Sequence, residues 1–169
     1  MKWSMDIIEK IAKRKAILFL GAGISANAVS LDGKKHPPTW EQFMRVILKE
    51  IADDSIKRYV NSLLKEKDYL TACEVLVNRI GNIRFEKIAI EEFLAPKYKN
   101  HKIHENILKL DARIVITPNV DKIYEVYAQA ETAGTILVKK YYDADLVSKI
   151  KSEERIILKI HGTLDKVRK

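Results

Sequence analysis

The sequence predicts an α/β fold in which a parallel sheet of about four strands carries a helical insert between its first and second strands. In the C-terminal half, short apolar runs alternate with amphipathic stretches, which is typical of strands joined by crossover helices. In the N-terminal half, one apolar run ends at a glycine-rich turn, and a long helical stretch follows it. With 169 residues, of which 47% are hydrophobic, the chain is large enough for one domain with a buried core.

The first strand is expected at residues 17–20, after a short amphipathic helix over residues 5–14. Its apolar run stops at Gly21-Ala22-Gly23, which predicts a buried parallel strand entering a tight turn. Glycine lets backbone N–H groups approach an oxyanion that a Cβ would keep away. A helix starting at Ser25 would direct its free N–H groups to the same point, which suits a phosphate.

The glycine turn matches a nucleotide-binding fingerprint only in part. Gly21, Gly23 and Ala26 have the spacing G-x-G-x-x-A, but the usual fingerprint also needs an acidic residue about 20 positions later, at the end of a second strand. Glu41 has that spacing but lies in a helical pattern. The sequence therefore indicates either a site unlike that of ordinary dehydrogenases or a strand–helix turn without a ligand.

Residues 40–110 are expected to form the helical insert, after a loop over residues 29–38. Thr39 and Gln42 have the spacing of a capping box, which predicts a helix start there. The insert is too long for a simple crossover, so we expect it to cover one face or edge of the sheet and to form the wall of a pocket. Its later helices are predicted at residues 55–64, 69–79, 85–94 and 103–110.

The C-terminal half is expected to alternate strands and helices. The predicted strands are residues 113–117, 135–138 and 155–160, and the predicted helices are residues 121–130 and 143–152. The carboxyl ends of parallel strands meet at one rim, where ligands bind. The sequence therefore predicts one site formed by the glycine turn, by Thr117, Asn119 and Asp121 after the second strand, and by His161 after the last.

Composition excludes several kinds of site. Cys73 is the only cysteine, which excludes an internal disulfide and a multi-cysteine zinc site. His101 and His104 lie one helical turn apart without a third ligand nearby, so a packing role is expected rather than a metal site. No apolar run approaches the roughly 18 residues of a membrane span, and no signal pattern is present, so the cytoplasm is the expected location.

The net charge of +8 favours anionic partners, and nucleic acid is one of them. The basic residues are scattered through helical segments, however, with only short clusters such as residues 13–15 and 97–102. A solvated surface is therefore the favoured interpretation over a dedicated nucleic-acid face.

The three strand ends read GAGIS, TPNVD and HG, in this order, and together they resemble the sirtuin superfamily, the silent information regulator fold. The resemblance covers about residues 11–165 and implies a Rossmann-like sheet that binds NAD and breaks its nicotinamide–ribose bond. The helical block and the stretch Lys140-Tyr141-Tyr142-Asp143 look closer to the sirtuin-like domains of prokaryotic anti-phage defence proteins. Those domains resemble NAD hydrolases more than deacylases, and several work beside an Argonaute-type or helicase-type partner or inside longer chains. A homo-oligomer is expected on the same basis.

The resemblance also assigns roles to residues. Asn119 would orient the attacking water, and His161 would bind the nicotinamide ribose and act as the general base. Such a base needs a pKa near neutrality, which histidine has. Asp121 would hold the nicotinamide side or buttress Asn119. The remaining expected NAD-binding residues are Gly21, Ala22, Gly23, Ser25 and Thr117.

The sequence departs from the sirtuin pattern in three places. Pro118 stands where sirtuins have glutamine, and it removes a backbone donor and favours an extended Thr117. The zinc ribbon of deacetylases is missing, so no zinc is expected. The chain ends soon after His161, so we expect a single sirtuin-like domain over residues 1–169 that is incomplete at its C-terminus.

Three functions follow as hypotheses. The first is an NAD glycohydrolase that releases nicotinamide and ADP-ribose, acting in anti-phage defence. The second is an NAD-binding sensor or partner-binding module without turnover. The third, and the least favoured, is an NAD-dependent protein deacylase.

Overall fold

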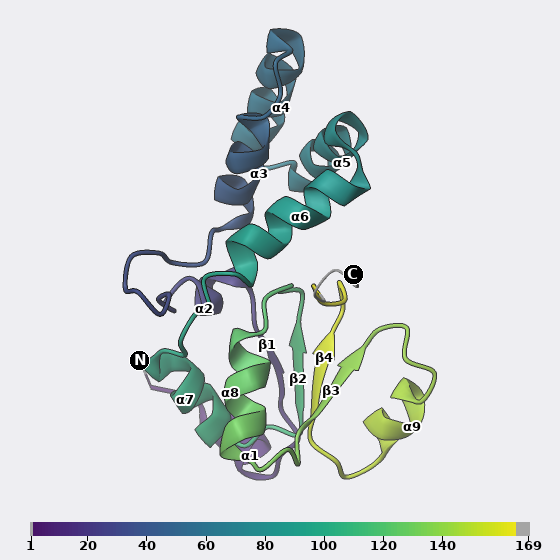
Figure 1. Ribbon diagram of the computed structural model, residues 1–169. Helices are drawn as coiled ribbons and strands as arrows, with labels where there is room; N and C mark the ends of the chain where they lie inside the picture. Colours follow the sequence, from purple (N-terminus) through teal and green to yellow (C-terminus); the bar gives the residue numbers. More distant parts are fainter. Residues whose placement is uncertain (1, 165–169) are drawn as a thin grey trace.

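The computed structural model describes residues 2–164 and has the α/β architecture that the sequence predicts. Its sheet is parallel throughout, with the strand order β1-β2-β4-β3. The strands are β1 (Ile17–Phe19), β2 (Ile114–Thr117), β3 (Leu137–Lys140) and β4 (Ile156–Lys159). All four strands therefore end at the same rim, which Figure 1 shows directly below the helical block.

One face of the sheet carries a hydrophobic core. Leu18, Val115, Ile157 and Val138 stand level on the four strands and face this core. Two helices cover it, α7 (Lys102–Lys109) and α8 (Ile123–Glu131), which contribute side chains such as Ile107, Tyr124 and Ala128. The buried face follows from the period-2 alternation of side chains along each strand.

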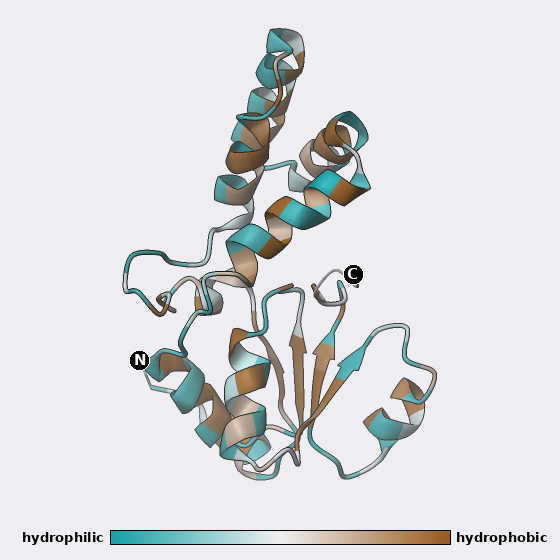
Figure 2. Cartoon of the chain, viewed as in Figure 1, coloured by the Kyte–Doolittle hydropathy of each residue, from teal (hydrophilic) through white to brown (hydrophobic). Residues whose placement is uncertain are grey.

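The helical insert has a core of its own. Phe43 is 1% exposed, and its ring packs edge-on against Phe85 at 5.4 Å and against Phe93 at 5.1 Å. Brown, hydrophobic faces of the four helices turn inward in Figure 2, as amphipathic helices require. These helices are α3 (Trp40–Leu48), α4 (Asp54–Glu66), α5 (Tyr69–Ile80) and α6 (Asn82–Phe93).

The insert stands beyond the carboxyl ends of the strands, while α7 returns along the sheet face (Figure 1). The capping box predicted at the start of α3 is confirmed, since Thr39 Oγ1 accepts from Gln42 N and Gln42 Oε1 accepts from Thr39 N at 2.8 Å. The insert therefore leaves and re-enters the sheet unit next to the strand ends.

The expectation that the first strand is buried is wrong. Ile17 and Phe19 are 58% and 64% exposed. They alternate along β1 with Leu18, which faces the α7–α8 core, so their side chains point to the opposite face of the sheet, and the described residues leave them open there. A further helix of the described chain is α9 (Leu146–Lys151). Only Leu18 and Leu20 of the apolar run face the core.

Several helix and strand boundaries differ from the predicted ones. Helix α2 (Ala22–Ser25) begins inside the glycine turn rather than at Ser25, because Gly21 serves as its N-cap. Strand β3 begins two residues late, because Thr135 N still donates to Thr132 O in the preceding turn. The first helix, α1 (Met5–Ala12), lies near its predicted place. Within residues 2–164, no helix combines the length and hydropathy that a membrane crossing requires.

Candidate functional site

The glycine turn leaves open space where a ligand could approach the backbone. A Cβ added to Gly21 or Gly23 would meet no heavy atom within 4 Å. Gly21 has an extended backbone with φ −85°, so its conformation alone does not demand glycine. The Gly21 carbonyl accepts a hydrogen bond from the Asn119 side chain, and no heavy atom covers the Cβ side of Gly21 or Gly23.

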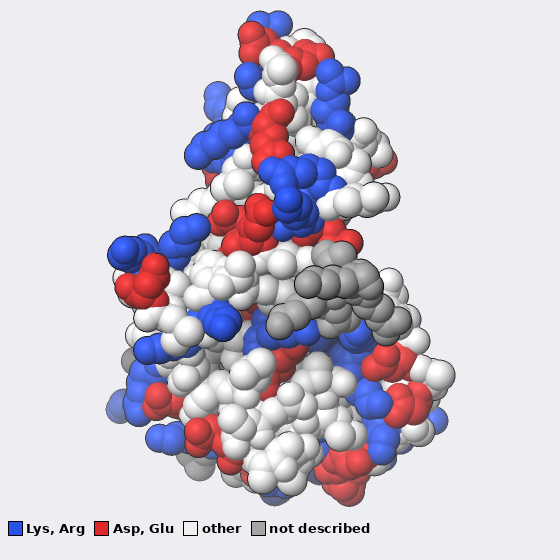
Figure 3. All heavy atoms as spheres, viewed as in Figure 1, with Lys and Arg blue, Asp and Glu red and all other residues white. Residues whose placement is uncertain are grey.

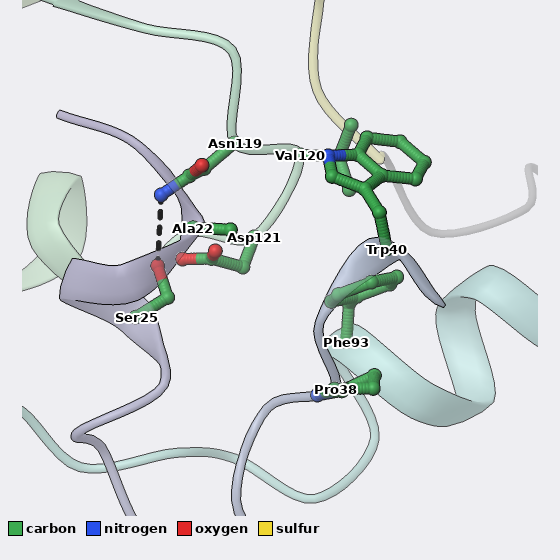
Figure 4. Close-up of a pocket in the computed structure, with 8 residues that line it drawn as sticks. All are labelled: Ala22, Ser25, Pro38, Trp40, Phe93, Asn119, Val120 and Asp121. Carbon is green, nitrogen blue, oxygen red and sulfur yellow. Dashed lines mark hydrogen bonds between the residues drawn. The ribbon is translucent and has the colours of Figure 1, made fainter. Parts of the chain in front are cut away.

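Asn119 is the residue that joins the second strand to the glycine turn. Its Nδ2 donates to Gly21 O at 3.1 Å and to Ser25 Oγ at 3.0 Å, and the second of these bonds is drawn in Figure 4. A backbone carbonyl only accepts hydrogen bonds, so this contact fixes which end of the amide is the nitrogen. The opposite atom, Oδ1, is buried and has no hydrogen-bond partner among residues 2–164. The side chain is 9% exposed, so an unused acceptor lies beneath the rim.

Thr117 fixes the backbone that carries Asn119. Its Oγ1 donates to Leu20 O at 2.8 Å and accepts from Asn119 N at 3.1 Å. The hydroxyl thereby ties the end of β1 to the segment after β2. Pro118 stands between Thr117 and Asn119, and Asn119 still reaches the glycine turn, where it donates to Gly21 O.

Asp121 lies beside Asn119 and is 6% exposed. Its Oδ1 accepts from Ile123 N at 3.0 Å, which places Asp121 in the turn before α8 rather than within the helix. Figure 4 shows these polar side chains on one side of a small cavity and apolar side chains on the other. The cavity, of about 10 Å³, is lined by Ala22, Ser25, Pro38, Trp40, Phe93, Asn119, Val120 and Asp121.

The apolar wall comes from both ends of the helical insert. Trp40 is the first residue of α3, and Phe93 is the last of α6. Phe43, which lies three residues after Trp40 on α3, belongs to the helical core instead. Sequence reasoning missed Phe93 and Pro38, since only the tertiary fold brings the two ends of the insert together. Val120, between Asn119 and Asp121, also packs against the helical core.

The side chain of His161 does not line this cavity. The backbone brings it to the rim, because Thr117 pairs with Lys159 and Ile160 N donates to Thr117 O at 3.1 Å. The imidazole is exposed and has no hydrogen-bond partner among the described residues. The structure thus brings together the glycine turn, Ser25, Thr117, Asn119 and Asp121, and it leaves the His161 side chain outside the cavity they line.

Two buried charges that sequence reasoning missed lie under the site. Lys159, the last residue of β4, is 1% exposed, and Glu125 of α8 is 8% exposed. Lys159 Nζ lies 2.9 Å from Glu125 Oε2. The one available signal was a lysine at the end of an otherwise apolar strand.

Neighbouring ionisable groups are held neutral by burial. Burial raises the pKa of Tyr98 to about 12, with smaller contributions from Glu92 and Asp121, and burial also raises the pKa of Tyr124 to about 12. His104 is fully buried, and burial lowers its pKa. These groups are therefore hydrogen-bonding or packing residues near neutral pH.

His101 and His104 form a helix cap. His101 N donates to His104 Nδ1 at 2.9 Å, and the His104 ring stacks against Tyr124 at 6.4 Å. No group of three or more metal-binding side chains occurs in the part of the chain that the structure describes.

Basic and acidic side chains are interspersed on the face shown in Figure 3. Several form surface ion pairs, such as Arg45 with Glu41 at 2.8 Å and Lys149 with Glu154 at 2.8 Å. Exposed pairs of this kind contribute little to stability and are typical of a solvated surface.

A scan against models of known protein families finds no match, and a search of curated proteins finds no similar chain.

Proposed function

We propose that the chain binds NAD at the rim formed by β1, β2 and β4 and hydrolyses it to nicotinamide and ADP-ribose. One observation carries the proposal. The Asn119 amide nitrogen is held by Gly21 O and Ser25 Oγ, while its Oδ1 is buried without a hydrogen-bond partner among the described residues, and Asn119 lines the same small cavity as Asp121. A buried acceptor without a partner is costly unless a donor from a ligand or a water satisfies it.

The chemistry suits such an acceptor. Cleavage breaks the bond between the ribose C1′ and the nicotinamide nitrogen, and the electron pair leaves with neutral nicotinamide. The oxygen of a water adds to C1′, and the proton it loses goes to the imidazole of His161 at the same rim. Asn119 Oδ1 accepts from that water and orients it, and the Asp121 carboxylate supports the positive charge that develops on the ribose.

The size of the cavity limits what enters it. About 10 Å³ holds a single water-sized group, so the dinucleotide lies across the open glycine turn with its diphosphate over Gly21, Ala22 and Gly23. Ser25 and Thr117 bind it indirectly, since their hydroxyls already hold Asn119 and the strand ends.

The sirtuin-like motifs add a biological setting to the proposal. They favour a defence enzyme that works in the cytoplasm as a homo-oligomer, beside a helicase-type or Argonaute-type partner or further domains. No zinc takes part in this reaction.

A second candidate is NAD binding without turnover. It is favoured by His161, whose imidazole is exposed and has no partner among the described residues that would orient it as a base. Calorimetric binding of NAD without release of nicotinamide supports this alternative.

The experiment incubates the protein with NAD and measures nicotinamide by chromatography. We expect release by the unaltered chain and a loss of about 100-fold or more in Asn119→Ala and His161→Ala. His36→Ala, which removes an exposed histidine outside the rim, is the matched control and keeps the activity. If the unaltered chain neither releases nicotinamide nor binds NAD, both candidates are contradicted.

A further inference from the structure

Lys159 and Glu125 form a buried ion pair directly beneath the candidate site. Their side chains are 2% and 9% exposed, and 2.9 Å separates Nζ from Oε2. Lys159 Nζ also donates to the backbone carbonyl oxygen of Asp121. One ammonium group therefore connects β4, α8 and the segment between β2 and α8.

This pair differs from the surface pairs of the molecule. In the pair Lys13–Glu9, for comparison, both side chains are more than half exposed. Taking two charges out of water is costly, and apolar residues of similar volume often stabilise a fold as well or better. Stability alone is therefore a weak explanation for a lysine at this position.

A second small cavity places the ion pair next to the site residues. This cavity has a volume of about 10 Å³. It is lined by polar residues of the candidate site and by both members of the ion pair, together with a few apolar side chains. The polar lining residues are Ser25, Thr117, Asn119, Asp121, Tyr124, Glu125 and Lys159. A displacement of Lys159 therefore reaches Asn119 through one shared space and through the Asp121 backbone.

We infer that Lys159 is a positioning residue for the segment from Asn119 to Asp121, with Glu125 balancing the charge of its ammonium group. The inference rests on the proposed function for its catalytic consequence. Thr117 holds this segment at one end through Asn119 N, and Lys159 holds it at the other end through Asp121 O. With both ends held, the Asn119 amide nitrogen keeps its two hydrogen bonds, to Gly21 O and to Ser25 Oγ.

The test replaces the ion pair in two ways. Lys159→Met/Glu125→Leu removes both charges and the hydrogen bond to Asp121 O, and Glu125→Gln breaks the ion pair but keeps the Lys159 donor. Lys13→Met, which disrupts an exposed pair, is the matched control. Each protein is measured for its thermal unfolding midpoint, for hydrogen exchange of the Asn119 side-chain amide by NMR, and for nicotinamide release.

We expect the double variant to unfold near the temperature of the unaltered chain, because no unpaired charge is left buried. Its Asn119 amide exchanges about tenfold faster, and kcat for nicotinamide release falls by 10- to 100-fold. Glu125→Gln unfolds at a lower temperature but protects the Asn119 amide better than the double variant does. Equal exchange rates in the double variant and the unaltered chain overturn the inference.

If the double variant does not fold, Glu125→Gln decides the question. Retained protection of the Asn119 amide in this less stable protein supports positioning by the lysine, and a loss of protection in proportion to stability contradicts it. Failure of the proposed function has a separate signature. In that case the unaltered chain releases no nicotinamide, while the exchange of the Asn119 amide still reports whether Lys159 positions it.

Discussion

The amide of Asn119 has one end fully bonded and the other end unused. Its nitrogen donates to Gly21 O in the glycine turn and to Ser25 Oγ in α2, while its oxygen is buried without a partner among the described residues. The residue type and its place after a strand led to the prediction that Asn119 is a site residue. The direction of its amide was not predictable, because it depends on the Gly21 carbonyl, 98 residues away in the chain.

Asn119→Asp tests this direction with almost no change in shape. A carboxylate cannot donate to Gly21 O, so we expect the variant to lose about 1–3 kcal/mol of the free energy of unfolding at pH 7. The folded state then raises the pKa of the new carboxyl, because only the protonated form donates. The loss is therefore complete above that pKa and shrinks as the pH falls toward the unfolded value of about 3.9. Urea unfolding at pH 7 and pH 4.5 measures it, and a loss that is equal at both pH values contradicts the assigned direction.

At the scale of single elements, local signals predicted most of what the structure shows. The capping box of α3 involves residues three apart, so the sequence contains the whole motif. The exposure of Ile17 and Phe19 in β1 was not predictable, since it depends on the strand order and on which face of the sheet the described helices cover. A run of apolar residues predicts a strand but says nothing of its place in the sheet.

Helix α7 allows a prediction about pH, since it begins with the capping pair His101 and His104. Burial lowers the pKa of His104 below its ordinary value of 6.5, so the unfolded chain binds its proton at a higher pH than the folded chain does. The stability contributed by neutral His104 is therefore complete above pH 6.5 and is lost as the pH falls toward the lowered value.

His104→Gln keeps the cap, because a glutamine at this position also accepts from the N-cap amide. We expect its free energy of unfolding to fall less steeply between pH 7 and pH 5 than that of the unaltered chain. Urea unfolding across this range measures the slope in both proteins, and an unchanged slope in His104→Gln means that burial of this ring does not control the response.

At the scale of the molecule, two hydrophobic cores meet at the site. One lies among α3–α6 and the other between the sheet and α7–α8, with Val120 packing against the helical core from the segment that carries Asn119. The helical block was predictable from its length and periodicity, and its role as a pocket wall was an expectation that Trp40 and Phe93 fit. The Lys159–Glu125 pair was not predictable, because it joins a strand and a helix that no local pattern connects.

Because the helical block and the sheet have separate hydrophobic cores, we expect each to have its own local stability. Leu76 of α5 is fully buried in the helical core, so Leu76→Ala leaves a cavity that costs about 2–5 kcal/mol. We expect backbone amides in α4, α5 and α6 to exchange faster in this variant, while those of β2 and β4 keep their rates. Ile157→Ala, in the sheet core, is the counterpart and accelerates the strand amides instead. Hydrogen exchange followed by mass spectrometry resolves the two regions. Equal acceleration of strands and helices in Leu76→Ala would mean that the two cores unfold as one unit, with the pocket wall as stable as the sheet beneath it.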